Sequence, residues 1–137
     1  MEFELNGSEY RVSQLDARRQ FHIMRRLSPM LAELATAVNV QSDGLDALQP
    51  LANALAGMSD SDADYCLFGL LACVQKKQGK TWSKICVDNQ LMFADMTMPV
   101  MLQIAVKAFQ FNFSDFFKSP AQILKPSASK PENLSNG

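Results

Sequence analysis

The chain has 137 residues, of which 47% are apolar and 20% are charged, which indicates one domain with a folded core rather than a disordered chain. The formal net charge of −1 argues against general nucleic-acid binding through long-range charge. No apolar run reaches the roughly 18 residues that a membrane-spanning helix needs. The first ten residues lack the basic start and apolar stretch of a signal peptide, so we expect a soluble, cytosolic protein.

The first twelve residues predict a β-hairpin. Asn6 and Gly7 both tolerate positive φ, as the two central positions of a type I′ turn require. This turn sets three cross-strand pairs, which are Glu2 with Arg11, Phe3 with Tyr10, and Glu4 with Glu9. The apolar side chains then share one face, which must pack on the rest of the domain: Phe3, Leu5, Tyr10 and Val12.

A long helix is predicted next, from about Leu15 to Val38. Ser13 is the expected N-cap, with Asp16 completing an imperfect capping box. Pro29 lacks an N–H and crowds the preceding turn, so it should kink or divide this helix. The apolar residues recur at three- and four-residue spacing: Ile23, Met24, Leu27, Met30, Leu31, Leu34 and Val38.

Two further helices are predicted in the middle of the chain. The first runs roughly over residues 46–56 and ends at Gly57, where left-handed geometry is favoured. The second opens with the Ser and Asp residues of 59–64, which cap backbone N–H groups and complement the helix dipole. Residues 65–74 are almost all apolar, which predicts a central, buried helix that the cations and glycine of 75–79 close.

A second short hairpin is predicted around Asp88 and Asn89, followed by a last helix over about residues 98–117. The segment 119–137 is rich in Ser, Pro, Lys and Asn and is predicted to be a flexible tail. The expected fold is therefore α+β and mainly helical, with a single globular domain over residues 1–118. Its elements are an N-terminal β-hairpin, about four helices and the second hairpin.

Catalytic and metal-binding side chains are scarce. Cys66, Cys73 and Cys86 are odd in number and form no C-x-x-C pair, so no disulfide framework is expected. Cys66 and Cys73 lie seven apart and should share one buried helix face. The only histidine, His22, lies among arginines and has no acidic residue three or four positions away on its helix, which predicts a solvated surface residue. We therefore predict no enzyme activity, no cofactor and no metal site.

Two short motifs also fail as ligand sites. The aspartates of residues 60–64 resemble the start of a calcium loop, but Leu71 stands where such a loop needs a bidentate glutamate. Residues 79–81 read Gly-Lys-Thr, like the end of a phosphate-binding loop, but Val74 replaces the required upstream glycine. Helix capping and a turn explain these two motifs.

A basic stripe on the first helix leaves three interpretations open. It contains Arg18, Arg19, Arg25 and Arg26. It could be a solvated helix face, a docking surface for an acidic partner segment, or the contact surface of a small DNA-binding phage regulator. No aromatic platform for nucleic-acid bases lies near these arginines. Arg18 and Arg25 are the candidate partner-binding residues.

The last predicted helix carries five of the nine phenylalanines within nine residues: Phe109, Phe111, Phe113, Phe116 and Phe117. A helix this apolar is either core or partly covered by another molecule. Eight methionines in the chain, several of them nearby, favour an adaptable binding surface. We therefore list all five phenylalanines as candidate contacts with a partner protein or with a second copy in a homo-oligomer.

Several segments carry a family resemblance, namely MEFELNGSEYR (1–11), LDARRQFH (15–22), MSDSDADY (58–65), VQKKQG (74–79), QLMF (90–93) and MPVMLQ (98–103). Together they resemble tail assembly chaperones of long-tailed bacteriophages and prophages over most of residues 1 to about 118. These are packing and turn motifs rather than a catalytic signature.

The resemblance implies a non-enzymatic assembly factor. Such proteins act in the host cytoplasm, engage the tape-measure protein and/or the tail-tube protein, and are absent from the mature virion. The resemblance supplies no residue-level binding site. The net charge and the lack of a long apolar run predict no binding to nucleic acid and no membrane partner. From the residues we expect the last helix to bind the client, with the basic face of the first helix as a secondary contact.

Overall fold

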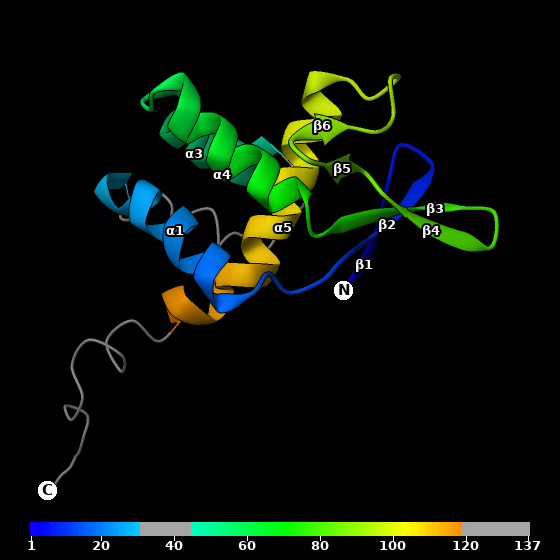
Figure 1. Cartoon of the computed structure of the whole chain (residues 1–137), viewed down its shortest axis with the longest axis horizontal. Coiled ribbons are helices and arrows are strands. Elements are labelled where there is room, and N and C mark those ends of the chain that lie inside the picture. The colour runs from blue at the N-terminus through cyan, green and yellow to red at the C-terminus, as the bar shows by residue number, and fades with distance from the viewer. Residues whose placement is uncertain (31–44, 119–137) are drawn as a thin grey trace, which may run out of the picture.

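The computed structural model describes residues 1–30 and 45–118 and, within them, six strands and four α-helices (Figure 1). The mainly helical α+β class is confirmed, whereas the tail over 119–137 lies outside the described residues. In chain order the elements are β1 (Glu2–Leu5), β2 (Ser8–Val12), α1 (Ala17–Leu27), the 3₁₀ helix η1 (Ser28–Met30), α3 (Leu45–Ala56), α4 (Asp60–Leu71), β3 (Val74–Gln78), β4 (Thr81–Lys84), β5 (Cys86–Val87), β6 (Gln90–Leu91) and α5 (Met98–Lys118).

The N-terminal hairpin has the predicted register. Asn6 and Gly7 have φ values of 52° and 82°, as a type I′ turn requires. Glu2 pairs with Arg11, Phe3 with Tyr10, and Glu4 with Glu9. The Phe3 and Tyr10 rings stack with their centroids 5.4 Å apart, and Tyr10 is buried, so the apolar face of the hairpin packs inward as expected.

A hairpin that was not predicted, β3–β4, stands where the C-terminal turn of the middle helix was expected. α4 ends at Leu71, and β3 pairs antiparallel with β2, so that Val74 lies opposite Val12. The prediction of a helix through residues 75–79 is therefore wrong. Gly79 has a φ of 64° and begins a two-residue turn rather than ending a helix, which fits a type II′ hairpin. The result is one four-stranded antiparallel sheet in the order β1-β2-β3-β4.

The first helix is shorter than predicted and begins at a different cap. The side chain of Asp16, not of Ser13, accepts a hydrogen bond from the backbone N–H of Arg19, at 2.7 Å. Ser13 instead donates from its hydroxyl to the carbonyl oxygen of Cys73. α1 ends at Leu27, and the 3₁₀ helix carries Pro29, so the predicted division of the helix is confirmed. The rest of that helix, residues 31–38, lies outside the described residues.

The two middle helices occupy the expected places with two corrections. Ser59 caps α4 as predicted, because its side chain accepts a hydrogen bond from the N–H of Asp62. Gly57 follows α3 but does not have positive φ, so the expected left-handed ending is wrong. Cys73 lies beyond the end of α4, in the connection to β3, so it does not share a helix face with Cys66.

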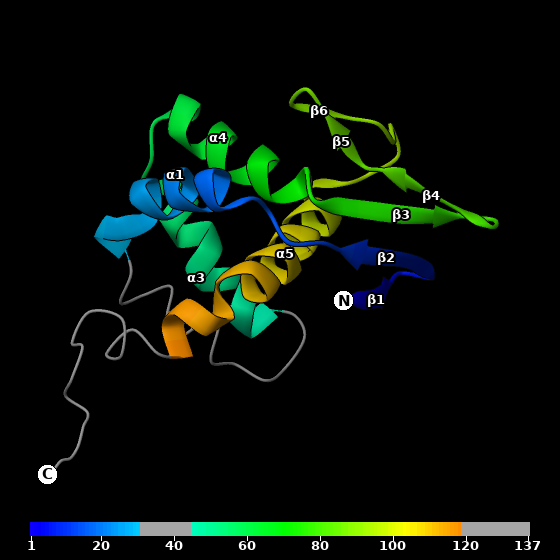
Figure 2. The ribbon, with the colours of Figure 1, turned by 60° about the horizontal axis from the view of Figure 1, so that its bottom comes forward.

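The last two predicted elements are confirmed. β5 and β6 form the short hairpin, with positive φ at both Asp88 and Asn89. α5 begins at Met98, with Pro99 in its first turn, where a missing N–H costs no helical hydrogen bond. Figure 2 shows α5 running between the other helices and the sheet.

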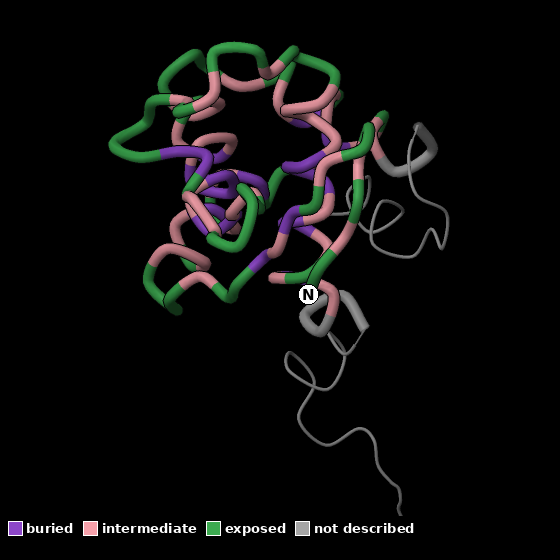
Figure 3. Tube along the Cα trace, turned by 90° about the vertical axis from the view of Figure 1, so that its right-hand side faces the viewer, coloured by how far each residue is buried: buried purple, intermediate pink, exposed green. Residues whose placement is uncertain are grey.

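The core lies where α5 meets α3, α4 and β2. Phe109, Ile104 and Ala108 of α5 are fully buried there, together with Leu70 of α4 and Leu51 of α3 at 1% exposure or less. Figure 3 shows the buried stretches gathered toward the middle of the described chain, with exposed turns around them. Packing on several sides explains why both α4 and α5 are so apolar.

Candidate functional site

Residues 1–30 and 45–118 contain neither a metal-binding cluster nor a membrane-spanning helix. No group of three or more His, Cys, Asp or Glu side chains in these ranges could hold a metal ion. No helix in the same ranges is long and apolar enough to cross a membrane.

The three thiols are buried in the core and poorly suited to chemistry. Desolvation raises the pKa of Cys66 and of Cys73 from 9.0 to about 11. Burial also raises the pKa of Cys86. A thiol with a raised pKa is almost entirely protonated at neutral pH and is a weak nucleophile. These cysteines therefore act as small core residues.

His22 is a packing residue on the outside of α1. Its ring lies edge-on to Phe21 and to Tyr65, with centroids 5.3 Å and 6.4 Å away. Desolvation and then the neighbouring arginines, Arg25 and Arg26 foremost, lower its pKa below the usual value. The imidazole is therefore mainly neutral at pH 7, and none of its contacts resembles a catalytic pair.

Two arginines of the basic stripe on α1 contact α4, and the other two are exposed. The Arg26 guanidinium lies 3.9 Å from the centre of the Tyr65 ring and 3.1 Å from the Asp62 carboxylate. Arg19 lies over the same ring at 5.2 Å. These two side chains join α1 to α4, so they contribute to the fold rather than to a free basic surface.

The other two arginines flank an exposed aromatic ring. Arg18 and Arg25 are exposed, and Phe21, between them in the sequence, keeps 61% of its surface exposed. Residues 18, 21 and 25 share one helix face, which we name the α1 outer face. The ion pairs among the described residues join Arg26 to Asp62 and Lys77 to Glu9, so Arg18 and Arg25 form none there.

The phenylalanine cluster of α5 is largely core where it is described. Phe109 is 0% exposed and Phe113 is 4% exposed, with ring centroids 5.2 Å apart. Phe111 points outward and keeps 39% of its surface exposed. Phe116 and Phe117 belong to α5, but their side chains lie outside the described residues. In this fold a partner can reach Phe111 but not Phe109 or Phe113, and partner binding by the cluster stays a prediction.

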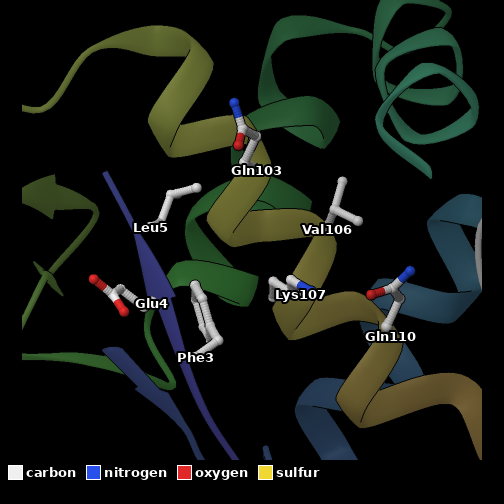
Figure 4. Close-up of a pocket in the computed structure, with 7 residues that line it drawn as sticks. All are labelled: Phe3, Glu4, Leu5, Gln103, Val106, Lys107 and Gln110. Carbon is white, nitrogen blue, oxygen red and sulfur yellow. The ribbon is translucent and has the colours of Figure 1, made fainter. Parts of the chain in front are cut away.

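A groove opens between β1 and α5, and we name it the β1–α5 groove (Figure 4). Its volume is about 340 Å³. On the strand side it is lined by Phe3, Glu4 and Leu5, and on the helix side by Gln103, Val106, Lys107 and Gln110. Sequence reasoning did not predict this groove, because the groove depends on where the hairpin packs.

Comparison with known protein families identifies the family of this chain. The family described as phage tail assembly chaperone protein, TAC, matches residues 6–125. This span includes β2, β3 and β4 of the sheet and all described helices, but it leaves out β1; it also extends past the predicted limit at about residue 118. No curated protein and no solved structure matches the chain. The chain belongs to the family of phage tail assembly chaperones.

Proposed function

We propose that this protein is a non-enzymatic assembly factor that binds the tape-measure protein and/or the tail-tube protein of its phage. It acts in the host cytoplasm during tail assembly and is not retained in the mature virion. Membership of the tail assembly chaperone family supports this role. The contact surface that we propose for the client is the α1 outer face.

The exposed ring of Phe21 carries this proposal. A phenylalanine with 61% of its surface in water gains about 1–2 kcal/mol when a partner covers it. Arg18 and Arg25 lie on the same helix face as Phe21, one turn before and one turn after it, and guanidinium groups match carboxylates in two-pronged hydrogen bonds. The surface therefore fits an amphipathic client helix with acidic side chains beside its apolar stripe.

The client segment needs such cover because an amphipathic helix aggregates when its apolar stripe is left in water. Aromatic and arginine side chains are the residues that most often dominate protein interfaces.

The alternative of a DNA-binding regulator has less support. Arg19 and Arg26 are engaged by Tyr65, and the chain has a net charge of −1.

Co-expression with the phage's tape-measure and tail-tube proteins tests the proposal. Tagged wild-type protein should capture one or both, and Phe21→Ala combined with Arg18→Glu and Arg25→Glu should reduce capture at least tenfold. The wild-type protein should not bind duplex DNA at physiological salt.

Two control substitutions separate this face from general surface effects. Met98 is an apolar residue with 66% of its surface exposed, and Lys84 is an exposed cation on β4. Met98→Ala and Lys84→Glu should each capture the client as well as the wild type. Undiminished capture by the triple variant, with an unchanged melting temperature, would exclude the α1 outer face as the client surface.

A further inference from the structure

Within residues 1–30 and 45–118, β1 is an edge strand of the sheet. The strand order β1-β2-β3-β4 gives β1 a single neighbour in the sheet. Because a two-residue turn makes Leu5 and Ser8 a hydrogen-bonded pair, the alternation along the ladder turns the N–H and C=O groups of Glu2 and Glu4 away from β2. The reciprocal hydrogen bonds between Met1 and Val12, at 2.7 Å and 3.2 Å, agree with this alternation.

The β1–α5 groove lies beside this edge. Figure 4 shows Phe3 and Leu5 on the strand side and Val106 on the facing helix, with Glu4 directed away from α5. Successive side chains of a strand point to opposite faces. A strand added next to β1 would therefore place every second side chain in the groove, opposite the α5 residues that line it.

The opposite face of the hairpin carries three glutamates and one cation, Arg11, which lies across from Glu2. Glu2, Glu4 and Glu9 are exposed, and Glu4 lies directly across from Glu9. Lys77 approaches Glu9 at 3.8 Å, whereas the described ion pairs include neither Glu2 nor Glu4. These two carboxylates lie on the same residues that present free backbone groups.

Their charge decides which strand can pair with β1. If two copies paired antiparallel about Phe3, Glu2 of each would face Glu4 of the other, and like charges directly opposite are destabilising. Acidic residues on an edge strand protect it from such self-association. A strand with Lys or Arg at these positions instead meets complementary charge.

We propose that β1 accepts an extended segment of a partner protein as a fifth strand, with alternating apolar and basic side chains. The apolar side chains enter the β1–α5 groove, and the basic side chains face Glu2 and Glu4. Backbone hydrogen bonds to the strand edge supply affinity, and the alternating side chains supply specificity. The site is separate from the α1 outer face, and neither assignment depends on the other.

A short acetylated peptide of alternating valine and lysine is the probe, titrated against the full chain by NMR. Its addition should shift the amide resonances of β1 and of the groove residues on α5 and slow the exchange of the Glu4 amide. A peptide of alternating valine and glutamate should bind at least tenfold more weakly. In Glu4→Lys this preference should shrink by about tenfold, because the charge facing the peptide is reversed.

A proline substitution tests the strand pairing itself. Glu4→Pro removes an outward N–H without removing a β1–β2 hydrogen bond, so it should weaken peptide binding at least tenfold. Lys84→Pro is the matched control, because its N–H points outward from β4 at the other edge of the sheet, and it should bind like the wild type.

Three results would overturn the proposal. They are wild-type affinity in a folded Glu4→Pro variant, equal affinity of the wild type for the two peptides, and a concentration-dependent dimer that forms through β1. If Glu4→Pro does not fold, the affinities of the wild type and of Glu4→Lys for the two peptides still decide the outcome. Loss of client binding by the α1 variants would leave this peptide titration unchanged.

Discussion

Two phenylalanines that are two residues apart show how sharply burial divides α5. Phe109 is fully buried, whereas Phe111 keeps 39% of its surface exposed. Phe109→Ala should lower the free energy of unfolding by about 3–5 kcal/mol, because it removes a large side chain and leaves a cavity in the core. Phe111→Ala should lower it by about 1 kcal/mol or less.

Urea denaturation of both variants measures this difference. A similar loss in the two would contradict the structure and would put Phe111 in the core as well. The comparison also bears on the candidate client contacts, because only a phenylalanine that can be removed without unfolding the protein is available to a partner.

Asn112 shows what the spacing of residues cannot reveal. Its side-chain oxygen accepts the backbone N–H of Leu15 at 2.7 Å, and its amide donates to the carbonyl oxygen of Ala108 at 3.0 Å. A weaker contact joins it to Cys73 at 3.5 Å. The asparagine thus holds the segment before α1 against α5, across 97 residues of sequence. The sequence predicted a helix here but gave no sign of this connection, because its partners become neighbours only in the folded chain.

At the scale of elements, the close approach of α1 and α4 depends on Gly69. A Cβ atom at this position would lie 3.1 Å from Cδ1 of Ile23 and 3.2 Å from Nη1 of Arg19. Gly69→Val should lower the free energy of unfolding by about 1–3 kcal/mol, because its extra methyl groups must push the two helices apart. Thermal or urea denaturation measures this loss.

Gly57→Ala is the matched control for this prediction. Its added Cβ would meet nothing closer than 3.8 Å, and the position does not have positive φ, so stability should change little. The loss of stability in Gly69→Ala should lie between those of Gly69→Val and Gly57→Ala, because the added Cβ would meet only the flexible ends of side chains. If Gly69→Val is as stable as the wild type, α1 and α4 do not pack as closely as described.

Local turn chemistry explains which elements could be predicted. Asn6-Gly7 and Asp88-Asn89 fix their hairpins through positive φ, which short-range sequence reveals. The strand over Val74–Gln78 was missed, because Lys and Gln favour helices and Gly79 can end a helix as well as begin a turn. These residues form a strand because Val74 pairs with Val12, a contact between distant parts of the chain.

The candidate site was also only partly predictable, because contacts between distant parts of the chain decide which side chains are exposed. The sequence identified Arg18 and Arg25 as candidates, and the fold leaves both exposed. It missed Phe21, because a lone aromatic residue on a polar helix face gives no periodic signal. It also ranked the α5 phenylalanines first, and two of these pack into the core. Composition predicts that large side chains exist, but only the packing of α5 against its neighbours decides which are left for a partner.

The whole fold should open in stages that follow its contacts with α5. This helix packs against α3, α4 and β2, and its residues from Ile104 to Phe109 are mostly buried. The turn of the β3–β4 hairpin, at Gly79 and Lys80, is exposed and extends away from the helices (Figure 2). Amide hydrogen exchange should therefore be slowest in the middle of α5 and fastest, among hydrogen-bonded strands, near this turn.

The staged opening can be measured by native-state hydrogen exchange at increasing urea concentrations. The β3–β4 amides should exchange through openings that depend weakly on urea, because a local opening exposes little surface. The α5 amides should exchange only through global unfolding and so depend strongly on urea. Equal protection and equal urea dependence in both places would instead mean that the sheet and the helices unfold as one unit. In that case the edge of β1 would be as rigid as the core, and a partner strand would meet an already formed surface.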